Sequence, residues 1–440
     1  MEKWAKRKGI LCNVQGAAQE KCSSLHTSML VKEVIHDRKI QQKTTYVAML
    51  DIKKAYDVLW QDGLFYKLYQ VGITGKLWRI LRGMYQDFVC KVMINGSPSK
   101  PIKALRGIHQ GAPCSTFCFI LYINDLLGDL QNVYPGVSLR GVKLNAVAYA
   151  DDITIMSTCK TDLQYLIDKC VSYGNRWHFE FSQLKSVILI YGKDTHKNQS
   201  ITMKNKILQP KSQEPHLGNV LAIDDNNENQ FVESRIVKCQ RICFGIQSLG
   251  SYLVPITVPI ASHLYKTLCL TKLCYGNEIM TISHKTMNAL ESFHAKNAKL
   301  FQGLPKNACN AGSLITIGWY PIECHIDILR LCFLWRIMVL PISSLYKLLL
   351  IRQLAWFIQN KALNHGPMST MFSTSIKYGL LTHVINATFY GKCIKLLQWK
   401  RIVYDKLCSH WKTSLKITKL TFKSLLWLDI NSSSKLYDNF

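Results

Sequence analysis

Two adjacent aspartates, Asp151 and Asp152, are the residues of this chain whose types and spacing point most directly to chemistry. They stand in an otherwise apolar segment from Val147 to Met156, which predicts two short buried strands joined by a turn. A hydrophobic core cannot neutralise two carboxylates, so both side chains must face water, a cation or both. Paired aspartates are also ordinary turn residues, and this segment alone leaves both interpretations open.

A third carboxylate upstream favours a metal site. The apolar run Tyr46 to Leu50 predicts a buried strand, and it ends at Asp51. Two divalent ions about 4 Å apart can stabilise the attacking and leaving oxygens when a 3′ hydroxyl attacks a nucleotide α-phosphate. Mg²⁺ prefers carboxylate oxygens for this task. We expect Asp51 and Asp151 to supply the bridging ligands, with Asp152 beside them.

The segment from Arg106 to Ser115 lies between these strands and contains Gly107, Gly111 and Pro113. Such residues let the backbone pass close to a flat ligand, and Pro113 suits the first position of a following helix. That helix, expected over Thr116 to Leu127, is apolar almost all round and should be buried.

Taken together, these segments resemble motifs A, B and C of reverse transcriptases. Their amino-acid sequences are most similar to those of the non-LTR retrotransposon, or LINE-type, branch. Their order, spacing and flanks all agree with that family. The matching residues are Asp51 with Lys54-Ala55-Tyr56-Asp57, then Arg106-Gly107-x-x-Gln110-Gly111-x-Pro113-x-Ser115, then Tyr149-Ala150-Asp151-Asp152.

Weaker similarity extends the resemblance over roughly Gln15 to Leu340. Gln15-Gly16 and the helical stretch Thr27 to Ile35 are similar to the fingers that precede motif A. Phe179 to Ser186 looks like motif D, and His216-Leu217-Gly218 looks like the motif E hairpin that supports a primer.

The resemblance implies roles for single residues. Asp51, Asp151 and Asp152 would hold the metal ions, and Lys185 would be a proton donor to pyrophosphate, although a lysine near a strand is also commonly a solvated charge. Tyr56 would exclude a ribose 2′ hydroxyl. The alternative interpretation is that Tyr56 is only a half-buried tyrosine at a strand end. The residues implied to contact substrate are Tyr56, Arg106, Gln110, Gly111 and Tyr149.

The activity implied is that of an RNA-directed DNA polymerase, a nucleotidyltransferase that uses two Mg²⁺ ions, or Mn²⁺ in their place. Its partners would be an RNA template, a DNA primer and deoxynucleoside triphosphates, and its location the nucleus, the cytoplasm or both, as a ribonucleoprotein. An RNA-templated RNA polymerase is disfavoured, because such enzymes usually have Gly before the paired aspartates and no bulky residue at the Tyr56 position.

Most of the family's finger segment is missing, so we expect an N-terminally truncated fragment. The alternative function is therefore a catalytically inactive, degenerate or repurposed remnant that binds nucleic acid.

Composition agrees with a nucleic-acid partner. The chain has 55 Lys and Arg against 28 Asp and Glu, a formal charge of +27, for which solubility is the alternative explanation. Its 16 cysteines include no Cys-x-x-Cys pair, which indicates neither a zinc ribbon nor a disulfide scaffold and favours a reducing intracellular compartment. The most hydrophobic stretch, Leu331 to Ile351, is interrupted by charged residues, so we expect no membrane segment. The sequence does not determine the oligomeric state.

The expected fold is α+β: a right-hand polymerase palm, meaning an antiparallel sheet backed by helices, with partial fingers and a mostly helical thumb and C-terminal region. The expected domains are partial fingers at 1–43, the palm at 44–230, a helical thumb and connection at 231–345, and a basic helical region of unknown role at 346–440.

A loop is expected over Asp224 to Gln230, followed by a helix that begins at about Phe231. Its basic residues should lie on another face than its apolar ones, as a helix against a nucleic-acid duplex requires, although a solvated bundle helix fits the pattern as well. The apolar residues are Val232, Ile236, Cys239, Cys243 and Ile246, and the basic ones are Arg235, Lys238 and Arg241.

Overall fold

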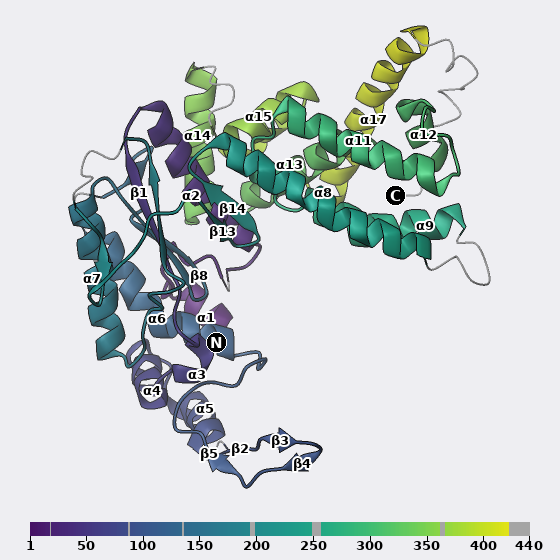
Figure 1. The fold of residues 1–440 in the computed structure, drawn as a ribbon. Helices are drawn as coiled ribbons and strands as arrows, with labels where there is room; N and C mark the ends of the chain where they lie inside the picture. Colours follow the sequence, from purple (N-terminus) through teal and green to yellow (C-terminus); the bar gives the residue numbers. More distant parts are fainter. Residues whose placement is uncertain are drawn as a thin grey trace. The chain divides into compact units, whose positions relative to one another are not determined.

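The structure is a computed structural model, which describes residues 1–17, 19–86, 89–133, 136–193, 199–248, 257–360 and 366–421. The chain divides into two compact units, Met1–Leu217 and Gly218–Phe440. The first is built around an antiparallel sheet and the second is mainly helical, which confirms the expected α+β class (Figure 1). The finer division into fingers, palm and thumb stays a prediction.

A four-stranded sheet forms the centre of the first unit. Its order is β10-β1-β9-β8, and every neighbouring pair is antiparallel. The strands are β1 (Thr45–Leu50), β8 (Ala146–Tyr149), β9 (Asp152–Ser157) and β10 (Val187–Tyr191). All residues of β9 after Asp152 are buried, so this strand is covered on both faces. The strands predicted on either side of the paired aspartates, and at Tyr46 to Leu50, are confirmed.

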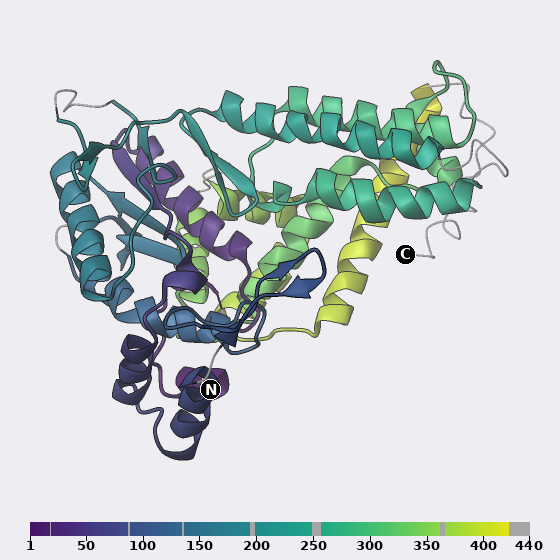
Figure 2. The same ribbon diagram turned by 60° about the horizontal axis from the view of Figure 1, so that its bottom comes forward.

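Three long helices pack on this sheet: α2 (Ser24–Ile40), α6 (Ser115–Gln131) and α7 (Lys160–Arg176). The sheet lies between α7 and α2 in both views (Figures 1 and 2). Helix α6 is buried along much of its length, as expected. Pro113 is not its first residue, because Cys114 is the N-cap and the helix begins at Ser115.

Shorter elements complete the first unit. Its remaining helices are α1 (Glu2–Arg7), α3 (Ala55–Val58), α4 (Gln61–Gln70) and α5 (Gly75–Gln86). A ribbon of β2 (Val89–Cys90), β3 (Met93–Ile94), β4 (Ser97–Pro98) and β5 (Ile102–Lys103) projects beyond α5 (Figure 1). Asn95 and Gly96, which both have positive φ, form the turn that joins β3 to β4. Small strands are β6 (Ser138–Leu139), β7 (Val142–Lys143), β11 (Thr202–Met203), β12 (Lys206–Ile207) and β13 (Gln213–His216).

The second unit begins with β14 (Asn219–Ala222) and is otherwise helical over its described part. Helices α8 and α11 run side by side in both views (Figures 1 and 2). The helices are α8 (Asp225–Ser248), α9 (Val258–Leu264), the π-helix η1 (Tyr265–Leu270), α10 (Thr271–Cys274), the 3₁₀ helix η2 (Asn277–Ile279), α11 (His284–Phe301), α12 (Asn310–Ile317), α13 (Ile322–Met338), α14 (Leu345–Asn360), α15 (Pro367–Lys377), α16 (Leu381–Phe389) and α17 (Leu396–Thr421).

Helix α8 differs from its prediction at two points. It begins at Asp225 instead of Phe231, because the Asp224 carboxylate accepts a hydrogen bond from the Asn227 N–H at 2.7 Å, as an N-cap does. Arg235 is buried with the apolar residues, while Lys238 and Arg241 are exposed. Arg235 follows Val232 by three residues and precedes Cys239 by four, so all three residues lie on one face of the helix.

No helix in the described part of the chain is both long and apolar enough to cross a membrane.

Candidate active site

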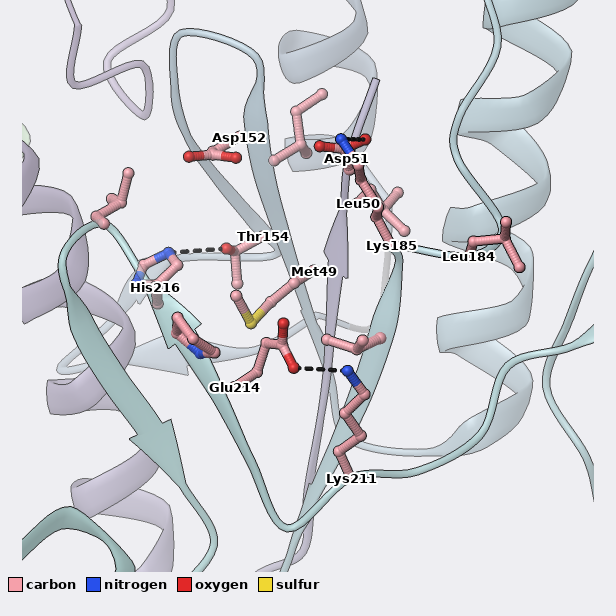
Figure 3. A pocket seen from close by; sticks show the side chains of 14 residues that line it. Met49, Leu50, Asp51, Asp152, Thr154, Leu184, Lys185, Lys211, Glu214 and His216 are labelled. Carbon is pink, nitrogen blue, oxygen red and sulfur yellow. Dashed lines mark hydrogen bonds and ion pairs between the residues drawn. The ribbon is translucent and has the colours of Figure 1, made fainter. Parts of the chain in front are cut away.

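The strand register brings the predicted carboxylates to one end of the sheet. Leu50 pairs with Ile153, so Asp51, directly after β1, lies beside Asp152, the first residue of β9. Tyr149 pairs with Asp152, which leaves Ala150 and Asp151 as a two-residue turn. Figure 3 shows the Asp51 and Asp152 side chains at the same end of the strands.

The backbone of Asp51 is held on both sides by the segment that resembles motif D. Its N–H donates to Ser186 Oγ at 3.3 Å, and its carbonyl oxygen accepts the Ser182 N–H at 2.7 Å. Between these two serines, Lys185 is exposed and places Nζ 3.6 Å from Asp51 Oδ2 (Figure 3). Oδ2 is buried and accepts no hydrogen bond from any residue that the structure describes. This oxygen is therefore available to a cation.

Burial and neighbouring carboxylates raise the pKa of Asp151 and of Asp152. Loss of hydration raises the pKa of Asp151, the charge of Asp51 raises it further, and Lys185 opposes the shift. The pKa of Asp152 is raised to about 6, first by loss of hydration and then by the charges of Asp151 and Asp51. Negative charge is thus concentrated at the strand ends, where a bound cation would relieve the repulsion.

An open pocket with a volume of about 380 Å³ adjoins the carboxylates. Asp51, Asp152 and Lys185 line it (Figure 3), whereas Asp151 and the five residues predicted to contact substrate do not. The other lining residues are Met49, Leu50, Ile153, Thr154, Leu184, Val187, Lys211, Glu214, Pro215, His216 and Leu217.

His216 forms the polar wall of this pocket. Its Nε2 lies 3.2 Å from Thr154 Oγ1, and its Nδ1 lies 3.3 Å from Ser28 Oγ (Figure 3 shows the first contact). Burial lowers its pKa to about 3, and the charge of Lys32 contributes to that shift. The ring is therefore neutral at pH 7 and is held by two hydroxyl groups.

The segment that resembles motif B is docked on the one that resembles motif A. The Gly107 N–H donates to the Leu59 carbonyl and the Ile108 N–H to the Tyr56 carbonyl, both at 2.8 Å. Gly107 has a φ of +89°, and a Cβ there would lie 2.9 Å from the Asp57 carbonyl oxygen. Gly107 is thus required both by its conformation and by the close approach of two backbones.

The predicted substrate residues lie around this docked segment. Tyr56 is half-buried, with its ring stacked on Phe119 at 5.6 Å between centroids and its hydroxyl donating to Thr116 Oγ1 at 3.2 Å. Gln110 donates from Nε2 to Asp57 Oδ1 at 2.8 Å. Tyr149 is half-buried, and Arg106, Gln110 and Gly111 are exposed.

Three residues that were not predicted as site residues hold the backbone at or beside the aspartates. Ser182 and Ser186 hold Asp51, and Gln15 hydrogen-bonds both polar backbone atoms of Ala150. No local pattern indicates these contacts, because their partners are far away in the sequence.

A ready-made metal centre is not present in the described part of the chain: no group of three or more His, Cys, Asp or Glu side chains there could hold a metal ion as it stands. The features that suit a cation are the buried Oδ2 of Asp51, which accepts no hydrogen bond from the described residues, and the raised pKa values of Asp151 and Asp152.

Comparison with known proteins supports the resemblance. Residues 11–218 match the family model described as reverse transcriptase (RNA-dependent DNA polymerase). A retrovirus-related Pol polyprotein from the type-1 retrotransposable element R2 of Popillia japonica is 30% identical over 136 residues, which are 30% of this chain and 19% of that protein. The RNA-directed DNA polymerase from the mobile element jockey of Drosophila melanogaster is 21% identical over 272 residues, 59% of this chain and 28% of that protein.

Among solved structures, apo telomerase from Candida tropicalis aligns with a TM-score of 0.38 at 11% identity, covering 86% of this chain and 55% of that chain. The aligned part of this chain spans less than a third of the length of either retrotransposon protein. Its first unit includes nearly all of the matched segment, with the three carboxylates inside it. Residues 11–218 therefore belong to the reverse transcriptase family, and their relatives are polyproteins of non-LTR retrotransposons.

Proposed function

We propose that this chain is an RNA-directed DNA polymerase of a retrotransposon, which adds deoxynucleotides to a 3′ hydroxyl on an RNA template. The observation that supports this most strongly is the register of Leu50 with Ile153, which sets Asp51 beside Asp152 at the mouth of a pocket. Only a few positioned carboxylates are needed, because Mg²⁺ takes its other ligands from water and substrate phosphates.

Asp51, Asp151 and Asp152 would hold two Mg²⁺ ions, or Mn²⁺. The residues fit such ions, since Asp51 Oδ2 is buried without a hydrogen bond and the paired aspartates repel each other. When bound, the ions would supply Lewis-acid stabilisation of the attacking and leaving oxygens. Lys185 could deliver a proton to the leaving pyrophosphate from its position 3.6 Å from Asp51 Oδ2.

The other residues would position the nucleotide. The Tyr56 ring, which is stacked on Phe119, would exclude a ribose 2′ hydroxyl. Arg106, Gln110, Gly111 and Tyr149 would contact the nucleotide or template, with the Gly107 backbone holding their segment against α3.

The formal charge of +27 supports binding to RNA template and DNA primer, with an affinity that falls as salt rises. A retrotransposon polymerase works on such partners in the nucleus or the cytoplasm, as a ribonucleoprotein. The nucleic-acid partners and the cellular location are both part of this proposal.

Primer extension tests it. The parent should extend a DNA primer on RNA with deoxynucleotides in the presence of Mg²⁺, and Asp151→Ala should abolish extension while circular dichroism stays unchanged. Asp168→Ala is the control, because Asp168 is exposed on α7 and hydrogen-bonds Gln164 of its own helix. A parent that binds RNA in a salt-dependent way but neither binds nucleotide nor extends the primer would favour the inactive remnant instead.

A further inference from the structure

Gln15 is a fully buried glutamine whose side chain hydrogen-bonds both the backbone N–H and the backbone carbonyl of one distant residue. Gln15 Nε2 donates to the Ala150 carbonyl at 3.2 Å, and the Ala150 N–H donates to Gln15 Oε1 at 2.9 Å. Oε1 also accepts the Ala17 N–H at 3.1 Å. The side-chain amide thus bridges two chain segments that are 135 positions apart.

The residue that it grips has a conformation that alanine rarely adopts. Ala150 has a φ of +56°, in the left-handed region that is unfavourable for L-residues and favours glycine. Such a residue persists only where its surroundings hold it. Ala150 directly precedes Asp151, and the two form the turn between β8 and β9. Any rotation of the Ala150 peptide therefore redirects the Asp151 side chain.

Gln15 is itself held rigidly. The Gly16 N–H donates to the Ala148 carbonyl at 2.7 Å, and the Ala148 N–H donates to the Val14 carbonyl at 2.9 Å. Gln15 consequently lies parallel to β8 at Ala148, along the edge of the sheet. These backbone hydrogen bonds direct the Gln15 side chain toward the turn. The hydrogen bonds from Gln15 to Ala150 therefore continue the pairing at the edge of the sheet.

We propose that Gln15 is a positioning residue for the polymerase site: it keeps Ala150 in the left-handed conformation and so sets the direction of Asp151 and Asp152. This inference rests on the proposed function. Misplacing a reacting group by about 1 Å can cost about 10²-fold in rate, so losing this grip should reduce turnover while leaving nucleotide binding in place.

The first test is Gln15→Met, which keeps the length of the side chain and removes its hydrogen bonds. We expect kcat for primer extension to fall about 10- to 100-fold, with the KM for deoxynucleotide changed less than about twofold. Gln131→Met is the matched control. Gln131 also bonds a carbonyl and an N–H of the same hairpin, those of Ala146 and Asn145, but at the end of β8 away from the carboxylates. Its loss should lower thermal stability without lowering kcat.

A second variant separates positioning from folding. Glycine accepts a φ of +56° unaided, so Ala150→Gly combined with Gln15→Met should fold and extend primer faster than Gln15→Met alone. This comparison also applies where Gln15→Met by itself does not fold. A double variant no better than Gln15→Met, or a Gln15→Met variant with the kcat of the parent, would overturn the proposal.

A measurement without catalysis keeps this inference distinct from the proposed function. Hydrogen exchange of the Ala150 amide should be slow in the parent and at least about tenfold faster in Gln15→Met, with α7 amides unchanged. A parent that extends no primer would refute the polymerase assignment, while slow exchange at Ala150 would still show that Gln15 holds the turn. Equal exchange at Ala150 in both proteins would refute the grip itself.

Discussion

A Cβ atom at Gly107 would lie 2.9 Å from the carbonyl oxygen of Asp57, so these two residues hold their chain segments at the closest approach that backbones allow. Tyr56 and Gln110 lie on either side of this contact, and it decides how the nucleotide-binding segment meets the residues that follow Asp51.

Gly107→Ala should therefore damage the site more than Gly111→Ala. Both glycines have positive φ, +89° and +85°, but a Cβ at Gly111 meets nothing within 4 Å in the described structure. Both substitutions introduce conformational strain, but only Gly107→Ala also places a Cβ against backbone atoms. We expect Gly107→Ala to lower the thermal midpoint of the first unit by several degrees more, since about 1 kcal/mol corresponds to about 2–4 °C in a unit of this size. Equal midpoints would contradict the close contact.

Lys185→Met should change metal binding and turnover in opposite directions. The Lys185 ammonium competes with a cation for Asp51, but the Lys185 side chain is 73% exposed, so its removal should tighten Mn²⁺ binding only between about 1.4- and 5-fold, as measured by titration calorimetry. If Lys185 protonates pyrophosphate, kcat should fall about 10²-fold or more. Lys185→Arg keeps the positive charge and should leave metal affinity unchanged. Weaker metal binding in Lys185→Met would count against competition.

Tyr56→Val should relax discrimination against ribonucleotides, because it removes the ring that is stacked on Phe119. Tyr56→Phe loses only the hydrogen bond to Thr116 and should keep the selectivity of the parent. The measurement is the ratio of kcat/KM for deoxynucleotide to that for ribonucleotide. A ratio in Tyr56→Val equal to that of Tyr56→Phe would exclude Tyr56 as the steric barrier.

His216 should make the first unit sensitive to acid. Its pKa is lowered from about 6.5 in the unfolded chain to about 3 in the fold, so its stabilising effect is complete above about pH 6.5 and is lost as the pH falls toward 3. At pH 5 the loss is about 2 kcal/mol. Urea unfolding of the parent and of His216→Gln at pH 7 and pH 5 should show a smaller loss in the variant. Identical losses would mean that His216 does not titrate in this way.

Lys238 and Arg241 are the α8 residues expected to meet nucleic-acid phosphates, because both are exposed. Replacing both with Ala should weaken binding of a primed RNA template and make the plot of log affinity against log salt less steep by about 1–2 units. Lys392→Ala with Lys395→Ala removes two exposed lysines elsewhere in the second unit and is the control. A slope that changes equally in both pairs would indicate a general effect of charge.

Arg235→Ala should behave differently from these two. Arg235 is buried and donates to the Asn277 and Asn219 side-chain oxygens at 3.1 and 3.2 Å and to the Tyr275 carbonyl. Its removal leaves buried acceptors unpaired, and we expect a lower thermal midpoint for the second unit. A stable Arg235→Ala variant with weakened RNA binding would instead restore the predicted role of this residue.

Much of the first unit could be predicted from local pattern. Apolar runs next to aspartates indicated β1, β8 and β9. The prediction was wrong where a single side chain decides a boundary: the Asp224 carboxylate caps α8, which begins at Asp225, six residues before the predicted start at Phe231. Arg235 was misplaced because a charged residue was assumed to be solvated, whereas paired acceptors allow its burial.

The sequence by itself determined which chemistry is available: three aspartates at strand ends, an aromatic residue five positions after the first, and a glycine segment between them. Those features are local, because strand pattern and turn preference depend on neighbours in the chain. Only the tertiary structure decided that Asp51 lies beside Asp152, that Ser182 and Ser186 hold the Asp51 backbone, and that Gln15 keeps Ala150 in its turn. These contacts join residues far apart in the sequence, and their geometry follows from strand register and burial, which no short segment encodes alone.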